Sequence, residues 1–102
     1  HRSDGLLIAG KVGAEVRAVA AGRVAYADWL KGYGLLLIVD HGNGWMSLYA
    51  FNDSLLKNVG DSVKVNDAIA TLGRSGGQAS PALYFELRQN GQPKDPRVWL
   101  KP

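Results

Sequence analysis

Residues 81–88, Pro-Ala-Leu-Tyr-Phe-Glu-Leu-Arg, constrain the fold more than any other stretch of this chain. Apolar and polar side chains alternate there with a period of two, which is the pattern of a β-strand with two different faces. Three apolar residues share the face expected to pack into a core: Leu83, Phe85 and Leu87. The opposite face carries four residues: Ala82, Tyr84, Glu86 and Arg88. An aromatic hydroxyl between a small residue and two opposite charges is typical of the floor of a binding site.

Short apolar stretches separated by turn residues run through the rest of the chain. Thirteen glycines and many Val, Ile, Leu and Tyr residues favour short strands joined by tight turns. Strands are expected at residues 5–9, 15–19, 23–29, 33–40, 45–51, 59–63, 65–69, 68–72 and 82–89. Many short strands with regular turns predict a compact antiparallel all-β domain, either a two-sheet sandwich or a partly open barrel.

Several segments carry more specific expectations. Residues 5–9 suit a buried strand, and residues 33–40 are apolar enough to form a central strand covered on both faces. Asn43-Gly44 favours a hairpin turn. Residues 52–56 are expected to form a turn or a single helical turn, and residues 93–102 an extended tail anchored by Trp99.

Length and composition narrow the function classes. A chain of 102 residues is one small domain that buries about 65% of its unfolded surface. It has no cysteine, which excludes disulfides and thiolate metal sites. The net charge is +3, but the chain lacks the dense run of Lys and Arg that would indicate nucleic-acid binding. The longest apolar run, residues 35–39, is too short to span a bilayer.

The motifs around residues 81–88 resemble those of the LytM-type, lysostaphin-like zinc peptidases of bacterial cell walls. That family has G-x-S-G followed by P-H-L-H-F-E, where this chain has Gly-Arg-Ser-Gly-Gly at residues 73–77 and Pro-Ala-Leu-Tyr-Phe-Glu at residues 81–86. Further motifs match in the same order at residues 5–8, 22–24, 33–34, 40–44, 49–51, 60–63 and 69–73. The resemblance extends from about residue 5 to residue 96. It implies the LytM fold and one degenerate LytM domain over residues 1–102.

The resemblance also locates the family's metal ligands and catalytic histidines. The three ligand positions fall on Ser3, Leu7 and Tyr84, and the two histidine positions fall on Phe51 and Ala82. A catalytic zinc ion needs about three ligands from His, Asp, Glu or Cys, and none of these five residues is one. The resemblance therefore implies a non-catalytic relative with no catalytic residue, no metal and no cofactor.

An apolar and aromatic groove is expected where the family has its polar active site. Its predicted lining is Leu7, Tyr33, Leu36, Tyr49, Phe51, Ala82, Tyr84 and Arg88. An exposed apolar patch of roughly a few hundred Å² is typical of an interaction site, and Tyr and Arg are favoured binding anchors. The alternative is that these side chains fill the former metal cavity and bind nothing.

Two polar residues near these motifs have structural expectations. His41 belongs to a glycine-rich turn and is expected to make a hydrogen bond there. Glu86 is expected to form an ion pair with Arg88 or with another neighbour. Neither residue is expected to hold a metal ion.

Within the family, the sequence is most similar to the murein hydrolase activators, on the motifs at residues 27–34, 46–49, 75–78, 91–92 and 96–100. This implies a periplasmic cell-division factor at the septum that does not itself cut peptidoglycan. Its groove would bind an amphipathic helix of a zinc-dependent N-acetylmuramoyl-L-alanine amidase and relieve that enzyme's autoinhibition. It also implies that the chain is the C-terminal part of a longer protein, whose coiled coil docks on the membrane complex FtsE-FtsX.

Three other functions stay open on the sequence. The chain could be an active zinc endopeptidase of the same family whose ligands lie at other positions, or a module that binds peptidoglycan directly. The third is a biotinyl or lipoyl carrier domain, because residues 59–63 and 69–73 suit such a fold. The carrier function ranks last, since the chain lacks the exposed hairpin Lys flanked by Met or Asp.

Overall fold

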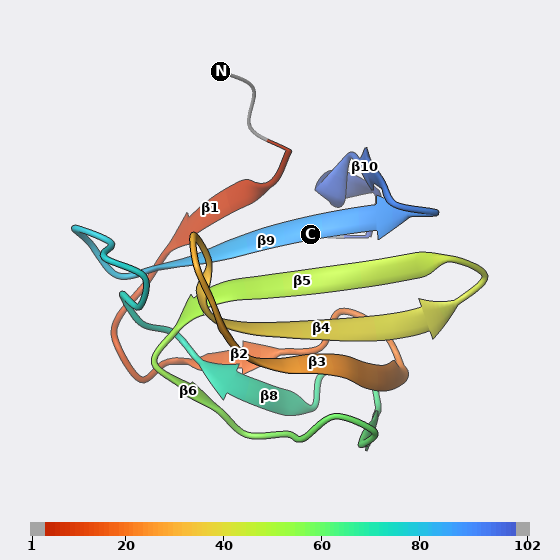
Figure 1. Ribbon diagram of the computed structural model, residues 1–102, viewed down its shortest axis with the longest axis horizontal. Helices are drawn as coiled ribbons and strands as arrows, with labels where there is room; N and C mark the ends of the chain where they lie inside the picture. Colours follow the sequence, from red (N-terminus) through yellow and green to blue (C-terminus); the bar gives the residue numbers. More distant parts are fainter. Residues whose placement is uncertain (1–3, 100–102) are drawn as a thin grey trace.

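The computed structural model describes residues 4–99 and shows two antiparallel β-sheets packed on each other (Figure 1). The strands are β1 (Leu6–Ala9), β2 (Glu15–Arg17), β3 (Gly22–Leu30), β4 (Gly34–Gly42), β5 (Trp45–Asn52), β6 (Ser54–Leu55), β7 (Ser62–Val63), β8 (Ala68–Thr71), β9 (Ala82–Gln89) and β10 (Gln92–Lys94), followed by a 3₁₀ helix at Pro96–Val98. The predicted antiparallel all-β, two-sheet architecture is confirmed. No helix among residues 4–99 has the length and apolar character that crossing a membrane requires.

The large sheet has the strand order β1-β9-β5-β4-β3-β7, and β10 continues the line of β1 along the same edge of β9. The small sheet has the order β2-β8-β6. The main core lies between the sheets and combines Val16, Ile69 and Leu72 with residues of the large sheet such as Val39 and Tyr49. The large sheet thus has an inner face, which points toward the small sheet, and an outer face on the opposite side.

Strand β9 has the bounds and the two faces that its alternation predicts. Phe85 and Leu87 point into the main core with at most 1% of their surface exposed, and Leu83 packs against the same cluster. Strands β1 and β5 pair with β9 on its two sides. The residues that alternate with Leu83, Phe85 and Leu87 therefore belong to the outer face: Ala82, Tyr84, Glu86 and Arg88.

The expectation that residues 5–9 are a buried strand is wrong. Strand β1 pairs with β9 only and forms an edge of the large sheet, so Leu7 is 65% exposed and Ile8 is 42% exposed. An apolar stretch does not reveal whether a strand has neighbours on both sides. The neighbours decide its exposure.

Three smaller expectations are also corrected. Residues 52–56 contain no helical turn, because Ser54–Leu55 pairs with β8 as strand β6. Strands do occur within residues 59–69, but they are only β7 and the start of β8. One turn precedes β7, where Asp61 accepts from the Asn58 N–H, and one separates β7 from β8, where Asp67 accepts from the Lys64 N–H, each at 2.8 Å.

The C-terminal segment is less extended than expected, since it contains β10 and the 3₁₀ helix. Trp99 is nevertheless an anchor, as predicted: its ring stacks on Trp45 at a centroid distance of 5.0 Å and meets His41 edge-on at 5.1 Å. The part of this segment beyond residue 99 lies outside the described residues.

A β-bulge between β4 and β5 shapes the outer face. The pairing shifts between Leu35, which is opposite Asn52, and Leu37, which is opposite Tyr49. Phe51 adopts a φ of +67°, which is unusual for a residue other than glycine. The Asn52 side-chain amide donates to the carbonyls of Leu35 and Tyr49, at 3.0 and 2.8 Å, and so fixes the bulge. As a result Phe51 lies on the outer face.

Candidate functional site

The outer face of the large sheet carries a second apolar cluster, separate from the main core. Its buried members are Leu36, Leu48, Ala50 and Phe51, and the partly buried side chains packed against them are Tyr26, Tyr33, Ile38, Met46 and Tyr84. The small sheet packs on the inner face and leaves this cluster on the other side (Figure 1). Strands β3, β4, β5 and β9 thus present an apolar surface.

A cavity of about 290 Å³ opens on this cluster and is called the outer hollow. Apolar side chains of β4 and β5 line it, together with Leu30, Tyr33 and Gly91: Leu36, Ile38, Met46 and Leu48. One charged residue, Arg88 of β9, also lines it. The outer hollow is therefore an apolar depression with a single cationic group.

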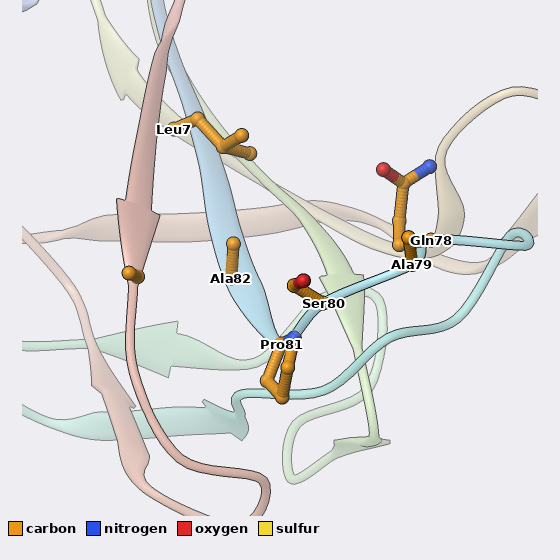
Figure 2. A pocket seen from close by; sticks show the side chains of 7 residues that line it. Leu7, Gln78, Ala79, Ser80, Pro81 and Ala82 are labelled. Atoms are coloured by element: carbon orange, nitrogen blue, oxygen red, sulfur yellow. The ribbon is translucent and has the colours of Figure 1, made fainter.

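A second cavity of about 320 Å³, the loop hollow, lies between β1 and the loop before β9. Figure 2 shows Leu7 reaching from β1 over β9, with Ala82 on β9 and residues 78–81 along the loop that leads into it. Gln78 and Ser80 supply its polar groups. This cavity contains two positions at which the family places zinc chemistry, Leu7 and Ala82.

Tyr84 neighbours one residue of each hollow, Leu7 of the loop hollow and Tyr33 of the outer hollow. It is the register partner of Leu7 on β1 and of Ala50 on β5. Its ring lies 5.7 Å from the Phe51 ring and 6.4 Å from the Tyr33 ring, measured between centroids. Seven of the eight predicted groove residues therefore lie on the outer face or at the loop hollow: Leu7, Tyr33, Leu36, Phe51, Ala82, Tyr84 and Arg88.

Tyr49 is the exception, and its prediction as a groove residue is wrong. It is 1% exposed and lies in the main core, where its ring meets Phe85 edge-on at 5.4 Å. Its hydroxyl accepts from the Val19 N–H at 3.1 Å and lies 2.8 Å from the Ser47 hydroxyl. Regular alternation would put Tyr49 and Phe51 on one face, but the bulge turns Phe51 to the other.

Five residues of the outer hollow are absent from the groove that the sequence predicts: Leu30, Ile38, Met46, Leu48 and Gly91. For three of them, Ile38, Met46 and Leu48, the spacing along the strand could have indicated the face on which they lie. Leu36 and Ile38 are two apart on β4, and Met46 and Leu48 are two apart on β5, so each pair shares a face of its strand. The apolar character of both faces of β4 hid this pattern.

A buried carboxylate organises the polar residues of β9. Glu86 is 2% exposed, and its two carboxylate oxygens accept from the Tyr84 hydroxyl at 2.6 Å and from Arg88 Nε at 2.8 Å. The predicted ion pair between Glu86 and Arg88 is confirmed. Burial, and next the hydrogen bond to Glu86, raise the pKa of Tyr84. The hydrogen bond to Glu86 is also the main cause that raises the pKa of Arg88.

These contacts predict how the domain responds to alkaline pH. The pKa of Tyr84 and that of buried Tyr49 are both raised above the usual value of about 10, so both phenols keep their protons in the folded state when the unfolded chain would lose them. Stability from these groups is intact below pH ~10 and is lost as the pH rises further. Tyrosinate absorbance at 295 nm should show a late-ionising fraction that Tyr84→Phe and Tyr49→Phe each reduce. An unchanged titration curve in both variants would contradict these contacts.

His41 lies outside this site, and its ring bonds to residues outside the glycine-rich turn in which the sequence predicts a hydrogen bond. Its Nδ1 lies 2.8 Å from the Ala21 carbonyl oxygen, and its Nε2 lies 2.7 Å from the Ser47 hydroxyl. A Ser–His pair at this distance could suggest a nucleophile. Ser47 is fully buried, however, so no substrate can reach its hydroxyl.

The residues at the family's metal positions do not fit a zinc ion. Leu7 has no donor atom, and the Tyr84 phenol is engaged with Glu86 and has a raised pKa, which disfavours the anionic form that binds metal. Ala82, at one of the family's histidine positions, has no donor atom either. The remaining ligand position, Ser3, lies outside the described residues. Within residues 4–99, no three His, Cys, Asp or Glu side chains are grouped for a metal ion.

Curated relatives of this chain include two murein hydrolase activators of Escherichia coli (strain K12). EnvC is 52% identical over 99 residues, which are 97% of this chain and 24% of that protein. NlpD is 42% identical over 99 residues, which are 96% of this chain and 26% of that protein. The chain thus spans about a quarter of the length of these relatives.

The fold has close counterparts among solved structures. The catalytic domain of the antimicrobial peptidase lysostaphin from Staphylococcus simulans superimposes with a TM-score of 0.89 at 24% identity, over 98% of this chain and 80% of that one. Residues 1–96 match the sequence profile of Peptidase family M23. The sequence match and the shared fold together show that this chain belongs to peptidase family M23.

Proposed function

We propose that this chain is a non-catalytic domain that activates peptidoglycan hydrolases by binding them through the outer face of its large sheet. One observation carries the proposal: the peptidase fold is kept, while the metal and histidine positions Leu7, Phe51, Ala82 and Tyr84 contribute to an apolar surface with two hollows. The names of the relatives EnvC and NlpD, murein hydrolase activators, support the same function.

The proposed partner is a periplasmic N-acetylmuramoyl-L-alanine amidase that splits septal peptidoglycan during cell division. The domain would then be the C-terminal part of a longer periplasmic protein, recruited to the septum by a coiled coil that docks on FtsE-FtsX. The share of about a quarter that this chain covers in EnvC leaves room for such a segment in that relative.

The outer face favours a helix as the bound element. Strands β9, β5 and β4 each have neighbours on both edges, so an incoming strand would find no free backbone groups there. A helix satisfies its own backbone and needs only side-chain contacts. From Ala82 to Arg88, β9 extends about 20 Å, which is the length of roughly 13 helical residues.

Activation by such binding is a shift between two states of the amidase. A helix that covers the amidase's own active site would be held by the outer face of this domain instead. The domain needs only to bind the open form of the enzyme better than the closed form. Each tenfold difference between these affinities shifts the equilibrium by about 1.4 kcal/mol.

Dye release from labelled peptidoglycan tests this proposal. The domain alone, a full-length amidase of the host bacterium alone and the mixture of both are compared. We expect dye release to occur, or to rise strongly, only in the mixture. Release by the domain alone, or no gain in the mixture with any amidase of that bacterium, would overturn the proposal.

A zinc prediction separates this function from that of an active endopeptidase. After dialysis against a zinc-containing buffer, elemental analysis should find far less than one zinc ion per chain, because the aligned positions supply no ligands. EDTA should leave Tm unchanged. Stoichiometric zinc, together with EDTA-sensitive release by the domain alone, would instead establish an endopeptidase with ligands at other positions.

Direct binding of peptidoglycan is the second candidate function, and the loop hollow favours it. This cavity has the Gln78 amide and the Ser80 hydroxyl on one side and apolar Leu7 and Ala82 on the other. Such a lining suits a short peptide with small side chains. Co-sedimentation with purified sacculi, with and without Ala82→Phe to fill the cavity, distinguishes this function from protein binding.

A further inference from the structure

The guanidinium of Arg88 is held in place by a carboxylate whose two oxygens each already accept one hydrogen bond. Arg88 Nε donates to Glu86 Oε1 at 2.8 Å, while Glu86 Oε2 accepts from the Tyr84 hydroxyl at 2.6 Å. Glu86 is almost fully buried, so this arrangement is fixed by the sheet. The contact with Glu86 therefore orients the Arg88 guanidinium through its Nε atom alone.

After the hydrogen bond to Glu86, Tyr33 and Asp4 also lie near enough to the same guanidinium to raise the Arg88 pKa electrostatically. Within residues 4–99, the structure contains no hydrogen bond from Nη1 or Nη2 of Arg88. The side chain keeps 32% of its surface exposed and lines the apolar outer hollow. Two parallel N–H groups of this kind match the two oxygens of a carboxylate.

We propose that Arg88 is a receptor for a carboxylate of the partner, an Asp or Glu that flanks the apolar side chain filling the outer hollow. This rests on the proposed function, since it specifies the helix that the outer face would bind. A helix that covers the hollow removes water from the Arg88 Nη groups. A partner without an acceptor at this point would bury unpaired donors, which is costly, so the carboxylate also provides specificity.

Other charged residues of the outer face lie across the apolar cluster from Arg88. Asp28 of β3 is paired with Leu36, and Asp40 of β4 is paired with Met46, so both acids lie on the far side of the apolar cluster from Arg88. Arg23 of β3 is the register partner of Asp40 on the same face, so a base accompanies that acid. Arg88 is therefore singled out by its place at the outer hollow and not by a general charge pattern of the face.

The test uses Arg88→Lys, measured by calorimetric titration against the full-length amidase. A lysine has one terminal nitrogen, which can keep the ion pair with Glu86 but cannot also present a two-pronged donor to the partner. We expect an unchanged Tm and an affinity lower by about tenfold. Arg17→Lys on β2 of the small sheet is the matched control and should bind like the wild type.

Charge exchange on the partner identifies the carboxylate. Each Asp and Glu of the amidase's non-catalytic helices is changed singly to Arg and tested against the wild-type domain and against Arg88→Glu. One of these changes should weaken binding to the wild type and restore binding to Arg88→Glu. The first of these effects is measured on the wild-type domain, so it tests the inference even where an Arg88 variant folds poorly.

The outcomes separate this inference from the function on which it rests. If Leu7→Lys abolishes binding while Arg88→Lys and every acidic substitution leave it unchanged, the carboxylate receptor is wrong and the outer face stands. If Leu7→Lys and Arg88→Lys both bind like the wild type, the outer face is not the binding site and both fall. No binding of the wild-type domain to any amidase overturns both as well.

Discussion

The variant Leu7→Lys should lose hydrolase activation while keeping its fold. Leu7 is 65% exposed, so a lysine at this position costs the folded domain almost nothing. In the proposed complex the same side chain is buried beside Tyr84 and Ala82, where an ammonium group would be desolvated without a partner. We expect the affinity for the amidase to fall by about 100-fold, with dye release reduced to that of the amidase alone.

Val59→Lys is the matched control for this prediction. Val59 is an exposed apolar residue of similar exposure, 63%, next to β7 at the opposite edge of the large sheet. It should activate like the wild type. Equal loss in both variants would mean that general surface apolarity matters, and full activation by a folded Leu7→Lys variant would remove Leu7 from the binding surface.

The sequence predicts most of the fold because β9 has two distinct faces. Its period-two alternation gives the strand, its bounds and the inward orientation of Phe85 and Leu87, and the structure has all three. Turn residues such as Asn43-Gly44 divide the remaining chain into strands. The number of neighbours of each strand is not encoded locally, which is why the prediction of a buried strand fails for edge strand β1.

The outer face is harder to predict because one backbone irregularity reverses the alternation. Up to Ala50, β5 alternates regularly, and the left-handed φ of Phe51 then places two consecutive residues in the outer cluster. No local pattern in residues 49–51 announces this bulge. It depends on the Asn52 amide reaching carbonyls on both strands, which is a tertiary contact.

Tyr49→Ala should destabilise the domain more than any surface substitution such as Leu7→Lys. Tyr49 is buried between the sheets, and deleting a buried aromatic ring leaves a cavity that typically costs about 3–5 kcal/mol. A domain of this size is stable by roughly 5–15 kcal/mol in total. We therefore expect the urea midpoint to fall sharply, with much of the protein unfolded at the lower end of that range.

Tyr49→Phe separates the structural role of this residue from a role in binding. It keeps the ring against Phe85 but leaves the Val19 N–H and the Ser47 hydroxyl without their shared partner, at a cost of about 1–3 kcal/mol. Its affinity for the amidase should equal that of the wild type, because the hydroxyl faces the main core. A variant with normal stability and weakened amidase binding would place Tyr49 on the binding surface and contradict the bulge-based assignment of the two faces.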